Sequence, residues 1–91
     1  MLRTDSRISK NERVPWRLIE EEAILVNIDT QEAIHLNEVA TKIWDAIDGK
    51  KTPEDIIKHI QNQFEVEERK AQEDTLKFLE ELLKQGLIHA C

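Results

Sequence analysis

The segment LNEVATKIWDAIDGKKT, residues 36–52, decides the fold that this sequence predicts. Asn37 is a favourable N-cap, because its side-chain oxygen can accept a hydrogen bond from a free amide of the first helical turn. The apolar residues that follow recur with helical spacing, which predicts an amphipathic helix over residues 38–47. Gly49 can adopt the left-handed conformation that ends a helix. Thr52 then starts a second helix, with proline at its first position and acidic residues in its first turn.

The chain before this segment predicts three short strands. Apolar residues indicate the first strand over residues 16–19, and a β-branched run indicates the second over residues 23–28. Residues 32–36 alternate, so their aliphatic side chains are expected to face the core while His35 faces away. Residues 29–31 are expected to make the intervening turn, because the Asp29 carboxylate can bond to the backbone two residues on. Short connections between these strands predict an antiparallel meander.

Two more helices are predicted, over residues 53–64 and 68–85. The apolar residues of the last helix cover an arc about 160° wide at 100° per residue. This arc is wider than one core contact needs, so we expect Leu76 and Leu83, at one edge, to line a groove. The expected core comprises Ile43, Trp44, Ile57, Ile60, Phe78 and Leu82.

The sequence therefore predicts an α+β fold in which a three-stranded antiparallel sheet is followed by three α-helices. Residues 1–12 are polar and unpatterned, which predicts a flexible N-terminal arm. Residues 13–91 are expected to form a single domain, with the apolar pair at residues 87–88 packed back on its core. No internal repeat or linker interrupts this region.

Charge is unevenly distributed along the 91 residues, whose formal net charge is −6. Residues 1–17 carry +3, whereas residues 18–91 carry −9. An acidic body repels phosphate groups, so a nucleic-acid-binding face is disfavoured. The same charge is compatible with a cationic partner segment, although a solvated charged surface would need no partner.

The sequence holds no recognisable catalytic or metal-binding constellation. The acidic residues form no catalytic pair, and no spacing typical of metal ligands connects the three histidines, His35, His59 and His89. Both glycines are expected to end helices, so no phosphate-binding loop is predicted. The single cysteine, Cys91, is the last residue. We therefore expect no catalytic residue, no metal and no cofactor, and a protein that is not an enzyme.

No signal-peptide or membrane-spanning run is present in the sequence, since no stretch approaches the roughly 20 apolar residues that a bilayer requires. The lone cysteine excludes a disulfide framework. Together these features predict a soluble cytoplasmic protein.

Residues 36–52 resemble the PqqD family, small peptide-binding domains also called RiPP recognition elements. The family pattern has Leu-Asn, an Ala three residues on, an Ile-Trp pair, an Asp-Gly stop and a Thr cap, and this segment contains each. The resemblance extends over about residues 14–90. Its further matching residues are Asp55-Ile56, Phe64, Asp74, Phe78-Leu79, Leu82 and Gly86-Leu87-Ile88.

This resemblance implies a winged-helix-like fold and a binding function. Such domains bind the leader segment of a ribosomally synthesised precursor peptide and present it to a modifying enzyme, often a radical S-adenosylmethionine enzyme. The best-known pathway makes pyrroloquinoline quinone, but no residue of this sequence selects that product.

Strand addition to the third strand of the meander is the expected mode of binding, because one edge of that strand has no partner. The expected peptide-binding residues are Glu32, Ala33, Ile34, His35 and Leu36 of the strand and Leu76, Leu79 and Leu83 of the last helix. Main-chain hydrogen bonds and a few apolar anchors predict millimolar to micromolar affinity.

Two other functions fit the predicted architecture. A winged-helix nucleic-acid-binding protein would have the same elements, but residues 53–85 carry nine acidic and only five basic side chains. A structural adaptor could instead dock on an enzyme through Leu76 and Leu83. The net charge predicts mainly monomer in dilute solution, while the free strand edge would also allow a strand-exchanged dimer.

Overall fold

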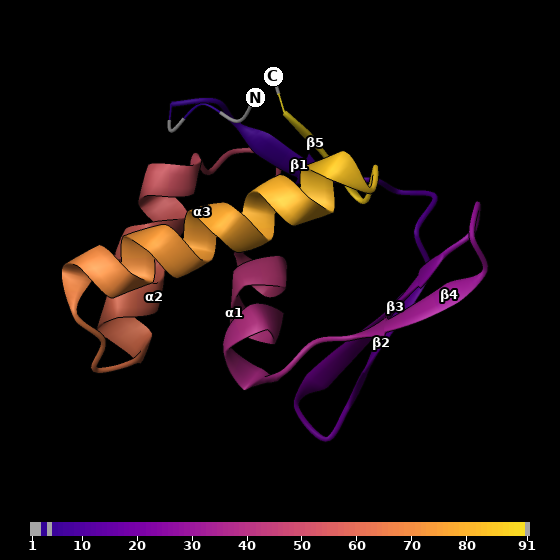
Figure 1. Ribbon diagram of the computed structural model, residues 1–91, viewed down its shortest axis with the longest axis horizontal. Coiled ribbons are helices and arrows are strands. Elements are labelled where there is room, and N and C mark those ends of the chain that lie inside the picture. The colour runs from indigo at the N-terminus through magenta and orange to yellow at the C-terminus, as the bar shows by residue number, and fades with distance from the viewer. Residues whose placement is uncertain (1–2, 4, 91) are drawn as a thin grey trace.

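The computed structural model describes residue 3 and residues 5–90. The described elements are, in chain order, β1 (Ile8–Lys10), β2 (Trp16–Ile19), β3 (Glu22–Asn27), β4 (Glu32–His35), α1 (Glu38–Ala46), α2 (Pro53–Gln63), α3 (Glu68–Lys84) and β5 (Ile88–Ala90). Figure 1 shows the β2–β4 sheet to one side of the helices, with α1 nearest to it and α3 crossing in front of the other two helices. The predicted α+β fold, a three-stranded antiparallel sheet followed by three helices, is confirmed.

The sheet buries one face, because cross-strand partners share a face of a pleated sheet. Ala23 and Leu25 of β3 are completely buried. The partner of Leu25 in β4 is Ile34, which is partly buried against the same core. Leu36 is also buried, whereas His35 is exposed, so the predicted alternation of β4 is confirmed.

The hydrogen-bond register of β4 follows from one bond at its end. The Leu36 N–H donates to the Ala23 carbonyl at 2.8 Å, across the β3–β4 pair. Antiparallel ladders alternate between bonded and non-bonded pairs, so Ile34, two residues earlier, also bonds to β3. The N–H and C=O groups of Ala33 and His35 therefore point away from β3, toward the free edge of the sheet.

Residues 29–31 lie in the turn between β3 and β4, as predicted, but the side chain that bonds to the turn backbone is that of Asn27 and not that of Asp29. The Asn27 Oδ1 accepts hydrogen bonds from the N–H groups of Asp29 at 3.0 Å and Thr30 at 3.3 Å. A side chain that caps a turn must precede the amides that it binds. Because β3 ends at Asn27 and not at Ile28, Asn27 holds that position.

The first two helices begin at the residues that were predicted to cap them. The Asn37 side chain accepts from the Ala40 N–H at 2.8 Å. Thr52 and Asp55 form a capping box, in which each side chain accepts from the backbone N–H of the other residue. Both glycines have positive φ, 84° for Gly49 and 74° for Gly86, as expected for residues that follow helices.

A buried threonine ties α1 to the sheet. The Thr41 hydroxyl accepts from the Ala23 N–H at 2.8 Å and donates to the Leu36 carbonyl at 3.2 Å. Thr41 is 4% exposed, so both bonds lie inside the protein. This hydroxyl fixes the N-terminal half of α1 against β3 and the end of β4.

The N-terminal region differs from the predicted arm at residues 8–10. These residues form β1, which pairs antiparallel with β5, and Ile8 has no exposed surface. One apolar residue in a polar stretch gives no alternation to detect, and its partner strand lies about 80 residues later. The expected packing of Leu87 and Ile88 on the core is confirmed, since each is 1% exposed. The parts of the arm at residues 1, 2 and 4, and Cys91, lie outside the described residues.

Trp44 lies at the centre of the core and has no exposed surface. The Trp16 ring meets it edge-on, with centroids 5.9 Å apart and an interplanar angle of 82°. The Lys10 ammonium lies 5.4 Å from the Trp16 centroid and 5.5 Å from the Trp44 centroid, and it donates to the Ile47 carbonyl at 2.9 Å. The core prediction is confirmed for all its residues except Phe78, which is only partly buried.

Replacing Trp44 with alanine should lower the free energy of unfolding by about 3–5 kcal/mol, because it opens a large cavity in a small core. Val39→Ala is the matched control on the same helix, since Val39 is 39% exposed. Urea unfolding followed by circular dichroism measures both variants. Unfolding midpoints that coincide for Trp44→Ala and Val39→Ala would show that Trp44 does not support the core.

The register of β4 predicts a pattern of amide exchange. The N–H groups of Ile34 and Leu36 should exchange slowly with deuterium, since both bond to β3, and those of Ala33 and His35 should exchange fast. Two-dimensional NMR spectra recorded after transfer to D₂O resolve the four amides. The reverse pattern would place Ile34 and Leu36 at the free edge.

Candidate functional site

The outer edge of β4 is the candidate site. The sheet order β2-β3-β4 leaves this edge without a partner strand in the described part of the chain. Glu32, Ala33 and His35 are exposed, Ile34 is partly buried and Leu36 is buried. The unbonded N–H and C=O groups of Ala33 and His35 make this edge a template for another strand.

Side chains of β4 divide between the two faces of the sheet. Ile34 and Glu32 lie on the core side, opposite Leu25 and Asn27 of β3. His35 lies on the outer face, where its Nε2 is 2.9 Å from a Glu22 carboxylate oxygen. An added strand would therefore meet an aliphatic and an acidic side chain on the core side.

A small cavity of about 80 Å³ shows which flank of α3 faces the sheet. It lies where β3 ends and α3 ends, near the base of the β3–β4 turn. Its lining residues are Asn11, Arg13, Val14, Asn27, Ile28, Asp29, Gln85, Gly86 and Leu87. Gln85, at the end of α3, therefore lies on the flank that faces the hairpin.

Helical spacing extends this flank along α3. Phe78 and Glu81 precede Gln85 by seven and four residues, so they share its side of the helix. The Glu81 carboxylate also accepts a hydrogen bond from the Gln85 side chain at 3.1 Å. Leu76 and Leu83 lie about half a turn around the helix from Gln85, at 100° per residue. The hairpin-facing flank is thus the Phe78 edge of the apolar arc.

The expected helix residues differ in their exposure and in the flank of α3 on which they lie. Leu79 has no exposed surface, so it packs in the core beneath α3 and offers no surface to a peptide in this structure. Leu76 and Leu83 are partly buried against the core, on the flank away from Gln85. Sequence reasoning found both edges of the arc, but periodicity alone does not say which edge meets the sheet.

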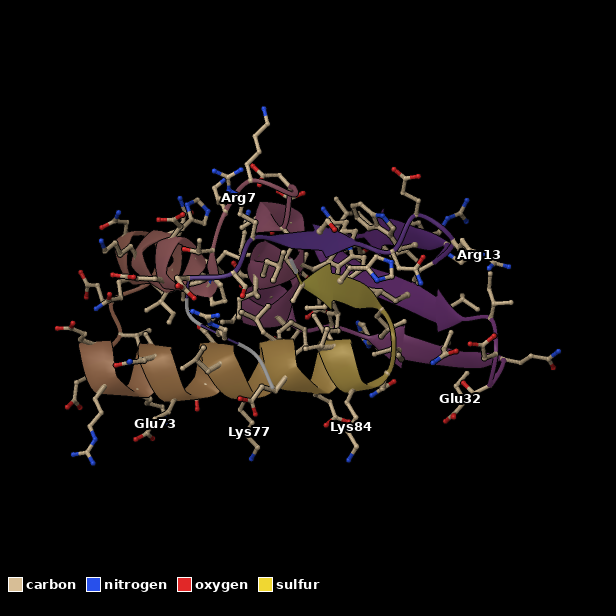
Figure 2. All side chains as sticks on the ribbon, turned by 90° about the horizontal axis from the view of Figure 1, so that it is seen from above. Arg7, Arg13, Glu32, Glu73, Lys77 and Lys84 are labelled. Carbon is tan, nitrogen blue, oxygen red and sulfur yellow. The ribbon has the colours of Figure 1, made fainter. Side chains whose placement is uncertain are left out.

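Acidic side chains lie on β4, in the β3–β4 turn and on the hairpin-facing flank of α3. Glu32 and Glu81 are exposed, and neither is in an ion pair with another described residue. Asp29 adds a third carboxylate beside the cavity, and Arg13 is the basic residue among the cavity's lining side chains. Figure 2 shows Lys77 and Lys84 pointing outward from α3, away from the body of the protein.

The two groups with shifted pKa values lie elsewhere. Burial lowers the pKa of Lys10, although the nearby Asp45 and Asp48 act in the opposite direction. Hydrogen bonds from the Lys51 side chain and from the backbone lower the pKa of Asp48. Over residues 5–90, no three His, Cys, Asp or Glu side chains are grouped so that they could hold a metal ion. The groups that the β4 edge offers to a partner are therefore its free backbone N–H and C=O groups and its apolar and acidic side chains.

Among solved structures, the chain is similar to one described as "TbiB1 in Complex with the TbiA(beta) Leader Peptide". The TM-score is 0.79 and the sequence identity is 25%, over 89% of this chain and 94% of that chain. A search of curated proteins found no match. In the described residues, no helix combines the length and apolarity that a membrane span requires.

The family model for coenzyme PQQ synthesis protein D matches residues 22–88, from the start of β3 to the start of β5. The match covers the segment that carries the resemblance in the sequence, and it includes β4 and all three helices. Because it spans well over half of the chain, the protein belongs to the PqqD family.

Proposed function

We propose that this protein binds the leader segment of a ribosomally synthesised precursor peptide, which adds as an antiparallel strand to the free edge of β4. The observation that carries the proposal is the outward direction of the Ala33 and His35 backbone groups, which no other strand satisfies in the described part of the chain. TbiB1, which shares the fold, is described in complex with a leader peptide.

Main-chain bonds alone cannot hold such a peptide. Two outward residues offer four hydrogen bonds, worth about 4 kcal/mol at about 1 kcal/mol each. Association costs at least about 4 kcal/mol, so this contribution is cancelled. Apolar side chains of the peptide must therefore supply the net affinity, at roughly 2 kcal/mol for each that is buried. Ile34 of β4 and Phe78 of α3, both partly buried against the core, are the apolar surfaces available for this contact.

The protein acts in this proposal as a carrier and not as a catalyst. It holds the leader and presents the rest of the precursor to a separate modifying enzyme, as the family resemblance implies. A radical S-adenosylmethionine enzyme is the proposed partner, and pyrroloquinoline quinone synthesis is one of the pathways that such a pair would serve. The leader would occupy the same edge that two copies would need for strand exchange, so we propose that the monomer is the binding form.

Ala33→Pro should weaken leader binding at least about tenfold, because proline removes an outward N–H and places its ring where the added strand would lie. The β3–β4 ladder does not use this N–H, so the domain should stay folded. Ala33→Ser is the matched control, since it keeps the N–H and places a small side chain on the outer face.

The measurement is calorimetric titration with the leader of a precursor encoded beside the gene, together with amide chemical shifts of residues 32–36. Thermal melts check that both variants are folded. Equal affinities for Ala33→Pro and Ala33→Ser, with shifts confined to another surface, would refute strand addition at β4.

A further inference from the structure

We infer that the leader carries an apolar residue followed, two positions later, by a lysine or arginine. The apolar residue lies opposite Ile34 and the basic residue opposite Glu32. The inference rests on the proposed strand addition and goes beyond it, because it names the side chains by which this protein selects its peptide.

The spacing follows from the geometry of the edge. A strand antiparallel to β4 runs from the Leu36 end toward the Glu32 end, and directly opposed residues share a face. Ile34 and Glu32 lie on the core side of β4, two residues apart. Peptide residues opposite them therefore also lie on the core side, and the residue opposite Ile34 comes first in the peptide sequence.

The first position requires an apolar side chain. Ile34 is partly buried and packs against the core cluster, as does Phe78 on the hairpin-facing flank of α3. Leu25 and Leu36 are already buried on the same side of the sheet as Ile34. An apolar side chain placed there covers exposed aliphatic and aromatic surface, whereas a polar one would lose its water without gaining a partner.

The second position favours a cation because the Glu32 carboxylate lies directly opposite it on the core side of β4, and Glu81 adds a second carboxylate on the hairpin-facing flank of α3. Glu32 pairs across the sheet with Asn27, which lines the cavity at the end of the hairpin. Gln85 lines the same cavity from α3 and is held by Glu81. Glu32 and Glu81 are thus each linked to a residue that lines the cavity, and neither is in an ion pair with a described basic residue. Arg13, the basic residue in the lining, shares the lining with the Asp29 carboxylate.

A library of random twelve-residue peptides displayed on phage tests the inference. Selection on the wild-type protein should enrich peptides with an apolar residue two positions before lysine or arginine. Selection on Glu32→Lys should replace the basic residue by aspartate or glutamate at that position. For a single synthetic peptide of the wild-type class, Glu32→Lys should weaken binding about two- to fivefold, the range of a cross-strand charge pair.

Two variants of α3 provide a matched comparison. Glu81→Lys should also reduce the preference for the basic residue, because Glu81 lies on the flank of Gln85. Glu80→Lys makes the same change of charge on the neighbouring residue, which lies about 140° around the helix from Gln85 at 100° per residue. It should leave the preference unchanged. Both glutamates are exposed, so neither change should unfold the protein.

The outcomes separate this inference from the function on which it rests. Selected peptides that shift the amides of residues 32–36 but show no basic preference, or a preference that Glu32→Lys leaves intact, overturn the inference and leave strand addition standing. If selected peptides bind without shifting those amides, both proposals are wrong. Reversal of the preference in Glu32→Lys, together with the difference between Glu81→Lys and Glu80→Lys, establishes the inference.

Discussion

Burial of Trp44 is the constraint on which the rest of the structure depends. Its ring is contacted by two other parts of the chain: the Trp16 ring of β2 packs against it in a T-shaped arrangement, and Lys10 of β1 places an ammonium group over its face. The indole Nε1 is buried without a partner in the described residues, which costs about 1–3 kcal/mol. The apolar area of a fully buried tryptophan and the aromatic and cationic contacts offset this cost. In this way one side chain of α1 holds the sheet and the N-terminal strand to the helices.

The position of the sheet, in turn, determines which of its groups stay free. The Thr41 hydroxyl holds α1 to Ala23 and Leu36, so the end of β4 leads directly into the first helix. Each residue of β3 can direct its backbone groups to only one neighbouring strand. Alternate residues of β3 therefore bond to β2 and to β4. The residues of β4 that face away from β3 consequently keep both backbone groups free. The candidate site is therefore a product of the pairing itself and needs no special side chain at Ala33 or His35.

Selectivity must then come from the surroundings of the edge. Figure 2 shows the basic residues Lys77 and Lys84 pointing outward from α3. Helical spacing from Gln85 places Phe78 and Glu81 on the flank that faces the hairpin. Glu32, at the far end of β4, adds negative charge on the sheet side. In the proposed binding mode, these carboxylates select a basic residue of the peptide, a role that composition alone could not distinguish from that of an ordinary solvated surface.

The sequence by itself determined the three helices, the three strands of the meander and the family. Local signals suffice for these features, because caps, glycine stops and helical periodicity act within a few residues: Asn37, Thr52 and Gly49 mark helix boundaries wherever the helices are placed. Tertiary structure alone decided three other features. Ile8 enters a strand because β5 lies beside it, Asn27 caps the turn because β3 ends there, and Gln85 lines the cavity at the end of the hairpin, which turns its flank of α3 toward the sheet. Each of these depends on a partner distant in the chain, or on where a ladder stops. An apolar arc shows how much of a helix is covered, but only packing decides which of its edges meets the sheet.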